Sequence, residues 1–314
     1  MAGRCKRFAP LLGLLVLVAL LAGCVGSTVQ GTKYTAFKDS TAVLAQDTRT
    51  SYEGVHNLWK NINAECLSTD GDVGAYERIL TNQGISCGKG AIVMERKIED
   101  PMPRLNARLQ ALDALVRYAT MLNVLATTDY AAGVDASMAK LNASLGNLAA
   151  ALPPAVPQKD LKQLQDATSV FVNVVKAAAK PYVEHKRKKA LQLVLTETQG
   201  CIQTLSEKLL VDNGYVKSFV TAGRDFSMGQ SIKTRPKDYE NRLAYDAKVL
   251  QTYETGTALI AAVAALDKAL ERLPKAHAEL LESLDKTGTD LERMEAFVAA
   301  TEQAMMIVQQ IKKI

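Results

Sequence analysis

Histidine and cysteine are the residue types in this chain that could hold a metal or act as nucleophiles, and their spacing decides which chemistry they support. The one Glu-x-x-His pair is Glu53 and His56, whereas a di-iron bundle needs two such pairs and two further glutamates. The patterns for haem attachment (Cys-x-x-Cys-His) and for zinc (His-Glu-x-x-His or paired Cys-x-x-Cys) do not occur. We expect His56, His185 and His277 on separate helices, as surface or rim residues. The sequence therefore predicts no cofactor and no metal site.

The glycine-rich run 84–90 is the one place that resembles a motif of hydrolases or nucleotide-binding enzymes. Gly84-Ile85-Ser86-Cys87-Gly88 has the Gly-x-Ser-x-Gly spacing, but no strand-like pattern precedes it as that motif requires, and the run lacks the P-loop spacing. Because catalytic sites in helical proteins leave recognisable spacings, we predict that the protein is not an enzyme.

Cys24 belongs to a pattern of its own at the N-terminus. A basic start precedes a thirteen-residue apolar run, and the run leads to the quartet Leu21-Ala22-Gly23-Cys24. The run is shorter than the roughly 20 residues that cross a bilayer, and a charged start with a small-residue end is typical of a cleaved signal. The segment resembles the signal peptide and lipobox of bacterial lipoproteins. The resemblance implies removal of residues 1–23, diacylglycerol on Cys24 and acylation of the freed amine; an uncleaved membrane anchor is the alternative.

The residues after Cys24 bear on where such a lipoprotein would reside. In many Gram-negative bacteria an aspartate directly after the lipidated cysteine retains lipoproteins in the inner membrane, and here Val25 follows. By this resemblance we expect the bacterial cell envelope, at the outer membrane and facing the periplasm. Residues 24–33 are small and polar, which predicts a lipidated flexible tether.

Removal of the signal also changes the charge of the chain. Three basic and no acidic residues leave with it, so the formal balance falls from 38 − 33 = +5 to 35 − 33 = +2. A nearly neutral chain gives no electrostatic case for binding nucleic acid.

Three cysteines remain in the expected mature chain: Cys66, Cys87 and Cys201. An exported protein resides where disulfides form, and three thiols allow one bridge. Cys66 and Cys87 bracket a glycine-rich segment, 66–90, which such a bridge would stabilise by about 3 kcal/mol through loop closure. We predict the pair Cys66–Cys87 ahead of any pair with Cys201, which borders a helical stripe as a buried, inert thiol.

Apolar residues repeat at intervals of three and four along most of residues 34–314, which predicts helices. The first stripe includes the only tryptophan, Trp59, which we expect to anchor the core. Connections are predicted near 153–157, where three prolines interrupt the pattern, and near 223–236. The stripes occupy 37–66, 105–122, 134–152, 161–182, 191–209, 243–270 and 280–308. We predict an all-α fold: an elongated antiparallel helical bundle with coiled-coil-like long helices.

Two expectations about the second half follow from the same pattern. The stripe from Leu243 to Leu270, with Leu250 and Tyr253 in it, is expected to face the core of a helix that ends near Leu273. Beyond Pro274 the four-three alternation passes through Gly288 without a change of phase, which predicts one further long helix.

A basic cluster concentrates positive charge near the middle of the chain. Such a cluster favours contact with an anionic envelope polymer, lipid headgroups or an acidic protein face, and the alternative is an ordinary solvated helix segment. Its residues are Lys180, Lys186, Arg187, Lys188 and Lys189.

The function expected from these features is that of a structural or protein-interaction module of the cell envelope, held to a membrane by its N-terminal lipid. The alternative is a helical binding protein whose tyrosines line a pocket for a small apolar or anionic ligand. A third hypothesis, a membrane-perturbing protein, rests on the alanine-rich run 258–266, which core packing also explains.

Overall fold

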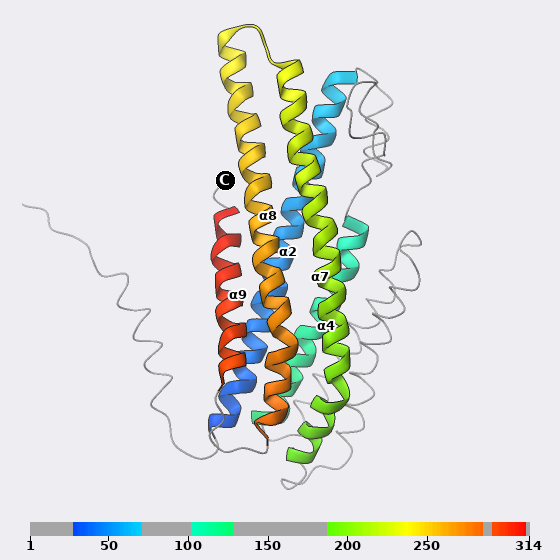
Figure 1. The fold of residues 1–314 in the computed structure, drawn as a ribbon, viewed down its shortest axis with the longest axis vertical. Coiled ribbons are helices and arrows are strands. Elements are labelled where there is room, and N and C mark those ends of the chain that lie inside the picture. Colours follow the sequence, from blue (N-terminus) through cyan, green and yellow to red (C-terminus); the bar gives the residue numbers. More distant parts are fainter. Residues whose placement is uncertain (1–27, 71–101, 128–186, 285–290, 312–314) are drawn as a thin grey trace, which may run out of the picture.

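The computed structural model describes residues 28–70, 102–127, 187–284 and 291–311 (Figure 1). Within these ranges the chain forms five helices and no strand: α2 (Thr28–Asp70), α4 (Met102–Thr127), α7 (Arg187–Thr234), α8 (Tyr239–Glu282) and α9 (Glu292–Ile311). The helices run side by side, with α7 and α8 forming a long antiparallel hairpin. At a rise of 1.5 Å per residue, the 48 residues of α7 extend over about 72 Å. The predicted all-α elongated bundle is confirmed.

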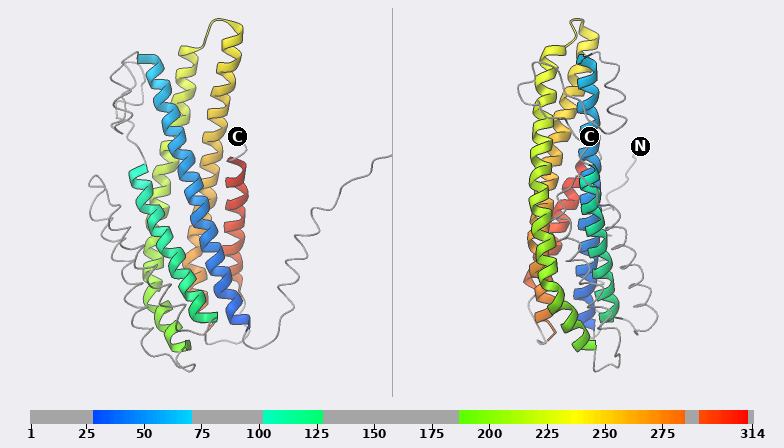
Figure 2. Two further views of the ribbon diagram at one scale, coloured as in Figure 1. Left: turned by 180° about the vertical axis from the view of Figure 1, so that it is seen from behind. Right: turned by 90° about the vertical axis from the view of Figure 1, so that its right-hand side faces the viewer.

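The two ends of the bundle contain different numbers of helices (Figures 1 and 2). We call the end at which α2 and α7 begin the base, and the end at which α7 turns into α8 the tip. All five described helices reach towards the base, whereas α4 and α9 stop well short of the tip. The tip therefore consists of α2, α7 and α8 as far as the described residues show.

The apolar stripes predicted for α2, for α4 and for the first half of α7 face the interior. Trp59 is buried, as are Phe37 and Leu112 from the first two stripes and Leu195 and Ile202 from α7. The core residues form one cluster around the base and a second one farther up, which includes Trp59 and Val220. Burial of these side chains, at about 25 cal/mol per Å² of apolar surface, is the main force that holds the helices together.

The prediction of a long connection at 223–236 is wrong, because α7 continues to Thr234 and only residues 235–238 join it to α8. Gly223 lies where α7 packs closely against α2, and a Cβ atom there would come within 2.3 Å of Ile62 Cδ1. Gly54 likewise approaches Leu259 of α8, at 2.6 Å. Both glycines are therefore places where the lack of a side chain lets two helices approach, rather than places where a helix ends.

The prediction of a helix boundary at Pro274 is also wrong, since α8 passes through it to Glu282. Proline has no N–H, so the carbonyl of Leu270, four residues earlier, loses its helical donor. The hydroxyl of Ser206 on α7 donates to that carbonyl instead, at 2.5 Å. A neighbouring helix thus replaces the missing hydrogen bond and allows the proline inside α8.

The start of α2 changes the expectation for the tether. The helix begins at Thr28, so six of the ten residues expected to be flexible are helical. A Cβ atom on Gly31 would lie 3.3 Å from Thr127 Cγ2 of α4, and Lys33 and Tyr34 are buried. These residues pack because α4, α8 and α9 surround them at the base, which the polar composition of the segment does not reveal.

Candidate functional site

Only some of the predicted site residues lie in the part of the chain that the structure describes. Cys24, Cys87, Lys180 and Lys186 lie outside the described residues, so the lipidation, the disulfide and most of the basic cluster stay predictions. Cys66 lies near the end of α2, which carries the helix several residues into the predicted glycine-rich loop. Arg187 is the first residue of α7, and Lys188 and Lys189 follow it, exposed at the base.

The groups that could bind a metal do not gather in the described part of the chain. No set of three or more His, Cys, Asp or Glu side chains there is placed to hold an ion. The ring of His56 stacks on Trp59, with centroids 5.5 Å apart and planes 10° apart, while Glu53 is exposed. Cys201 is a half-buried free thiol, and burial raises its pKa.

His277 differs most from the expectation, because it is not a surface or rim residue but fully buried in the base. Its Nδ1 lies 2.6 Å from Oε1 of Gln199, whose Nε2 donates to the carbonyl of Pro274 at 3.1 Å. That second bond fixes the orientation of the Gln199 amide, so Nδ1 carries the proton and donates. Nε2 is then the acceptor for the hydroxyl of Tyr118, at 2.8 Å.

This network stabilises the neutral imidazole. Burial lowers the pKa of His277 to about 3, because the charged form would lose its hydration without gaining a counter-ion. Burial also raises the pKa of Tyr118 well above its usual value, and the hydroxyl of Thr198 lies 2.6 Å from the Tyr118 oxygen. The three helices α4, α7 and α8 are therefore tied together by uncharged hydrogen bonds in the core of the base.

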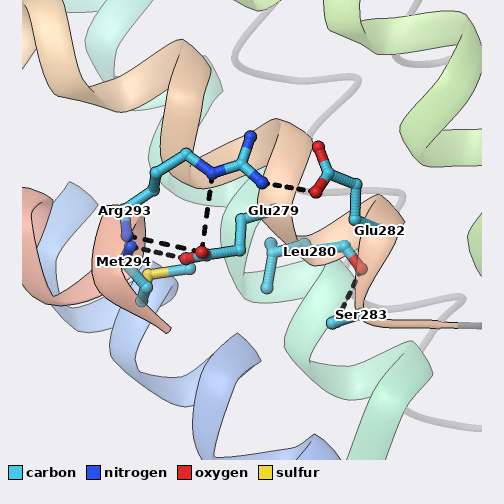
Figure 3. Close-up of polar contacts among 6 residues, drawn as sticks. All are labelled: Glu279, Leu280, Glu282, Ser283, Arg293 and Met294. Atoms are coloured by element: carbon cyan, nitrogen blue, oxygen red, sulfur yellow. Dashed lines mark hydrogen bonds and ion pairs between the residues drawn. The ribbon is translucent and has the colours of Figure 1, made fainter. Parts of the chain in front are cut away.

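A second polar arrangement joins α8 to α9 at the base (Figure 3). The buried carboxylate of Glu279 accepts hydrogen bonds from the backbone N–H groups of Met294, at 2.6 Å, and Arg293, at 3.3 Å. The guanidinium of Arg293 lies 3.5 Å from Glu279 and also binds Glu282. Glu279 therefore caps the N-terminus of α9, where free N–H groups and the helix dipole favour a negative charge.

The expectation of one long helix from Pro274 to the C-terminus is wrong, because this region contains the end of α8 and a separate helix, α9. α8 ends at Glu282, Ser283 closes it by donating its N–H to the carbonyl of Glu279, and α9 begins at Glu292. The unbroken apolar spacing across Gly288 reflects two helices that each bury a stripe in the same core.

The tip exposes apolar residues that the sequence pattern assigned to the core. Steps of four, seven and three residues place them on one face of α8 near its N-terminus, and we call this face the α8 stripe. Its members and their exposed fractions are Tyr239 (69%), Leu243 (60%), Leu250 (58%) and Tyr253 (40%). The prediction that Leu243, Leu250 and Tyr253 face inward is wrong: their side chains are exposed, and α4 and α9 do not extend along this part of α8.

The charged groups around the α8 stripe are largely paired. Arg235 binds both carboxylate oxygens of Asp246, the acidic residue in the middle of the stripe, and lowers its pKa. The guanidinium of Arg224 lies 4.9 Å above the ring of Tyr253, and that of Arg242 lies 5.8 Å from the ring of Tyr239. The stripe thus combines apolar side chains with a compensated rim, a composition that suits contact with another protein surface.

The tyrosines that were candidates for a ligand pocket do not gather at one place in the described residues. Tyr118 lies in the core, whereas Tyr215, Tyr239 and Tyr253 are exposed on α7 and α8.

One described helix, α8, is long and apolar enough by composition to cross a membrane. Core residues of soluble bundles pass the same test, and the lower half of α8 lies in the core next to α2, α7 and α9. Comparison of the chain with protein-family models, with curated proteins and with solved structures gives no match. The proposed function therefore rests on the residues of this chain alone.

Proposed function

We propose that this protein is a lipid-anchored helical module of the bacterial cell envelope that binds an α-helix of a partner protein through the α8 stripe. The observation that carries the proposal is the exposure of four large apolar side chains along one face of α8. Scattered surface leucines are ordinary, but a row with helical spacing on an uncovered helix matches the way helices pair in coiled coils and grooves.

The shape of the bundle supports this assignment. The expected anchor, Cys24, comes four residues before the first residue of α2, the helix that begins at the base, while the α8 stripe lies at the tip. A rigid hairpin with a helix of about 72 Å presents that stripe far from the point of attachment. Such an arrangement suits a protein that reaches a partner away from its own membrane.

Site-specific photo-crosslinking in the native envelope tests the proposal. A crosslinker that replaces Leu243 or Leu250 is expected to capture one protein, whereas a crosslinker at Val211, equally exposed at 59% but on α7, is expected not to capture it. Introducing Leu250→Glu into the chain with the crosslinker at residue 243 should abolish capture, because a carboxylate cannot be buried against an apolar helix without a large desolvation penalty.

Two controls make this result decisive. The Leu250→Glu chain must remain in the membrane fraction with an unchanged helical circular dichroism spectrum, which shows that anchoring and fold survive. Capture of the same protein from Val211, or capture that Leu250→Glu leaves unchanged, would contradict docking at the α8 stripe. Release of the protein by Cys24→Ser, with a soluble secretory signal in place of residues 1–23, tests the anchor separately.

A further inference from the structure

The α8 stripe has the register of a coiled-coil seam. Counted in heptads, Tyr239 and Tyr253 take position d, Leu243 and Leu250 take position a, and Asp246 takes the d position between them. The two tyrosines are two heptads apart, so the seam is about 21 Å long. In a pair of helices the residues at positions e and g border the seam and determine which partner fits. The e and g positions of α8 therefore carry information about the partner helix.

The e flank of the seam is acidic. It consists of Glu240, Ala247 and Glu254, all of them exposed. In the described part of the chain, neither glutamate forms an ion pair or hydrogen bond through its side chain, and Lys237, three residues before Glu240, lies in the connection that precedes the helix. Glu240 is in the first turn of α8, where a carboxylate favours the helix dipole, but Glu254 lies four turns farther on and has no such role. The residues three and four positions from Glu254, where a helical ion pair would form, are Leu250, Gln251, Thr257 and Ala258.

The g flank differs because α7 lies against it. Gly256 is buried, and a Cβ atom there would come within 3.1 Å of Arg224 Cβ of α7. Val249 is half-buried, and Arg242 lies beside the ring of Tyr239. The e flank is therefore the side of the seam that remains open to another helix.

The other charged groups that border the seam on α7 and α8 are paired or face elsewhere. Arg235 and Asp246 bind each other through both carboxylate oxygens, so Asp246 adds no net charge to the seam. Arg224 binds the carboxylate of Asp225. Lys248 takes position f, on the side of α8 opposite the seam. The two glutamates of the e flank thus remain as uncompensated charges that a partner helix would meet.

A second copy of this chain is a poor match for the seam. In an antiparallel pair with Tyr239 opposite the second copy's Tyr253, Glu240 would lie next to the second copy's Glu254, and Asp246 would lie opposite itself. Such contacts between like charges oppose association. A parallel pair would bring the e flank of one copy to the g flank of the other, which α7 covers. The charges therefore favour a different chain, with cations where the glutamates are.

We infer that the α8 stripe binds an amphipathic helix of another protein that carries lysine or arginine along the side facing Glu240 and Glu254. The inference rests on the proposed function and adds the chemistry of the partner to it. Apolar side chains of the partner cover the seam from Tyr239 to Tyr253, and its cations pair with the two carboxylates at the rim. Exposed pairs of this kind add little to affinity but discriminate between partners.

Two synthetic helical peptides test the charge preference. Each is about three heptads long with leucine at positions a and d; one carries lysine at e and g, and the other carries glutamate there, so that neither pairs with itself. Fluorescence anisotropy measures their binding to the mature chain, residues 24–314 carrying Cys24→Ser. The native sequence is expected to prefer the lysine peptide, and the double variant Glu240→Lys, Glu254→Lys the glutamate peptide. Between the two chains the ratio of dissociation constants should shift by at least about 10-fold, and by less at high salt. Contacts at the g flank are the same in both chains and cancel in this comparison.

A matched control distinguishes local charge from net charge. Glu271→Lys with Glu302→Lys makes the same change of net charge at exposed carboxylates outside the tip and should leave the ratio unchanged. Equal shifts in both double variants, or no shift in the variant of the e flank, would overturn the inference. Self-association of the native chain that the substitutions Leu243→Ser and Leu250→Ser abolish would also overturn it, because the partner would then be a second copy. Unchanged circular dichroism spectra show that the variants are folded.

The same serine variant separates failure of the inference from failure of the proposed function. If Leu243→Ser with Leu250→Ser weakens both peptides but reversal of the e-flank charges leaves their ratio unchanged, helices dock on the α8 stripe without selection for cations. If neither peptide binds the native chain, or if the serine variant binds both as well as the native chain does, the α8 stripe is not a docking surface and both proposals are contradicted.

Discussion

α8 passes through both ends of the bundle and shows how differently the same kind of residue behaves in each. At the base, Leu266 and Leu270 are buried, because α2, α7 and α9 surround this half of the helix. At the tip, Leu243 and Leu250 belong to the same predicted apolar stripe but remain exposed, because α9 and α4 do not extend that far. Apolar spacing therefore selects a face of a helix, and the number of neighbours decides whether that face is core or surface.

The two ends also differ in how their helices are held together. The base contains buried polar groups that join helices, such as His277 with Tyr118 and Glu279 with the start of α9. Farther up, close contact at Gly54 and Gly223 brings the backbones of α2, α7 and α8 together, and the Tyr52 hydroxyl donates to Oδ1 of the buried Asn213. The base should consequently respond to pH through His277, whereas the region of Gly54 and Gly223 should respond to added side-chain volume.

The largest expected effect contrasts a core residue of the base with a member of the α8 stripe. Phe297 is fully buried, with its ring centroid 6.0 Å from that of Phe37. Phe297→Ala is expected to lower the free energy of unfolding by about 3–5 kcal/mol, through lost burial and the cavity left behind. Leu250→Ala should change it by no more than about 0.5 kcal/mol.

Urea unfolding of the mature chain, followed by circular dichroism, measures both changes. If Leu250→Ala destabilised the protein as much as Phe297→Ala, the α8 stripe would be part of the folded core and the contrast between tip and base would be lost.

A somewhat smaller effect is expected from pH, and it should arise in the base. The unfolded chain protonates His277 below about pH 6.5, whereas the folded chain does so near pH 3, so the unfolded state binds more protons between these values. The stability contributed by the neutral imidazole is thus fully present above pH 6.5 and decreases as the pH falls towards 3. Between pH 7 and pH 4 the expected loss is about 3 kcal/mol.

Comparison with His277→Gln isolates this contribution from the titration of surface carboxylates. The variant is expected to be less stable at pH 7 but to show a flatter decline of unfolding free energy towards pH 4. Parallel pH profiles for the two chains would mean that His277 is accessible to protons in the folded state.

The smallest expected effect concerns the proline inside α8. Ser206→Ala should cost about 1 kcal/mol, because the carbonyl of Leu270 then has neither its helical donor nor a hydroxyl donor. In the Pro274→Ala background the cost should nearly vanish, since an alanine at this position restores the helical N–H. A double-mutant cycle with a coupling energy near zero would contradict this compensation.

Several particulars of the fold could be predicted from the sequence because they depend on local pattern. The stripe through Phe37, Tyr52 and Trp59 requires only that a helix with one apolar face bury that face, and all three side chains are buried. The elongated all-α architecture follows from many such stripes and the lack of strand-like alternation. The lipobox resemblance, which ends at Cys24, lies outside the described residues and stays a prediction of location.

The errors have a common physical cause, which is a partner distant in sequence. The sequence around Pro274 predicts a helix end, but Ser206, 68 residues earlier, donates its hydroxyl to the carbonyl that the proline leaves without a donor. The sequence around Gly223 predicts a connection, but Ile62 of another helix occupies the space of the missing side chain. His277 was expected at the surface, but Tyr118 and Gln199 form hydrogen bonds with both of its ring nitrogens in the core.

The sequence by itself determined that the chain forms long helices and which face of most of these helices is apolar. Only the tertiary structure decided where these faces are covered, because burial depends on neighbours that come from distant parts of the chain. It is the different reach of α4, α7 and α9 that buries Leu266 and exposes Leu250 on a single helix. The same difference in reach leaves the α8 stripe uncovered, and the proposed function rests on that stripe.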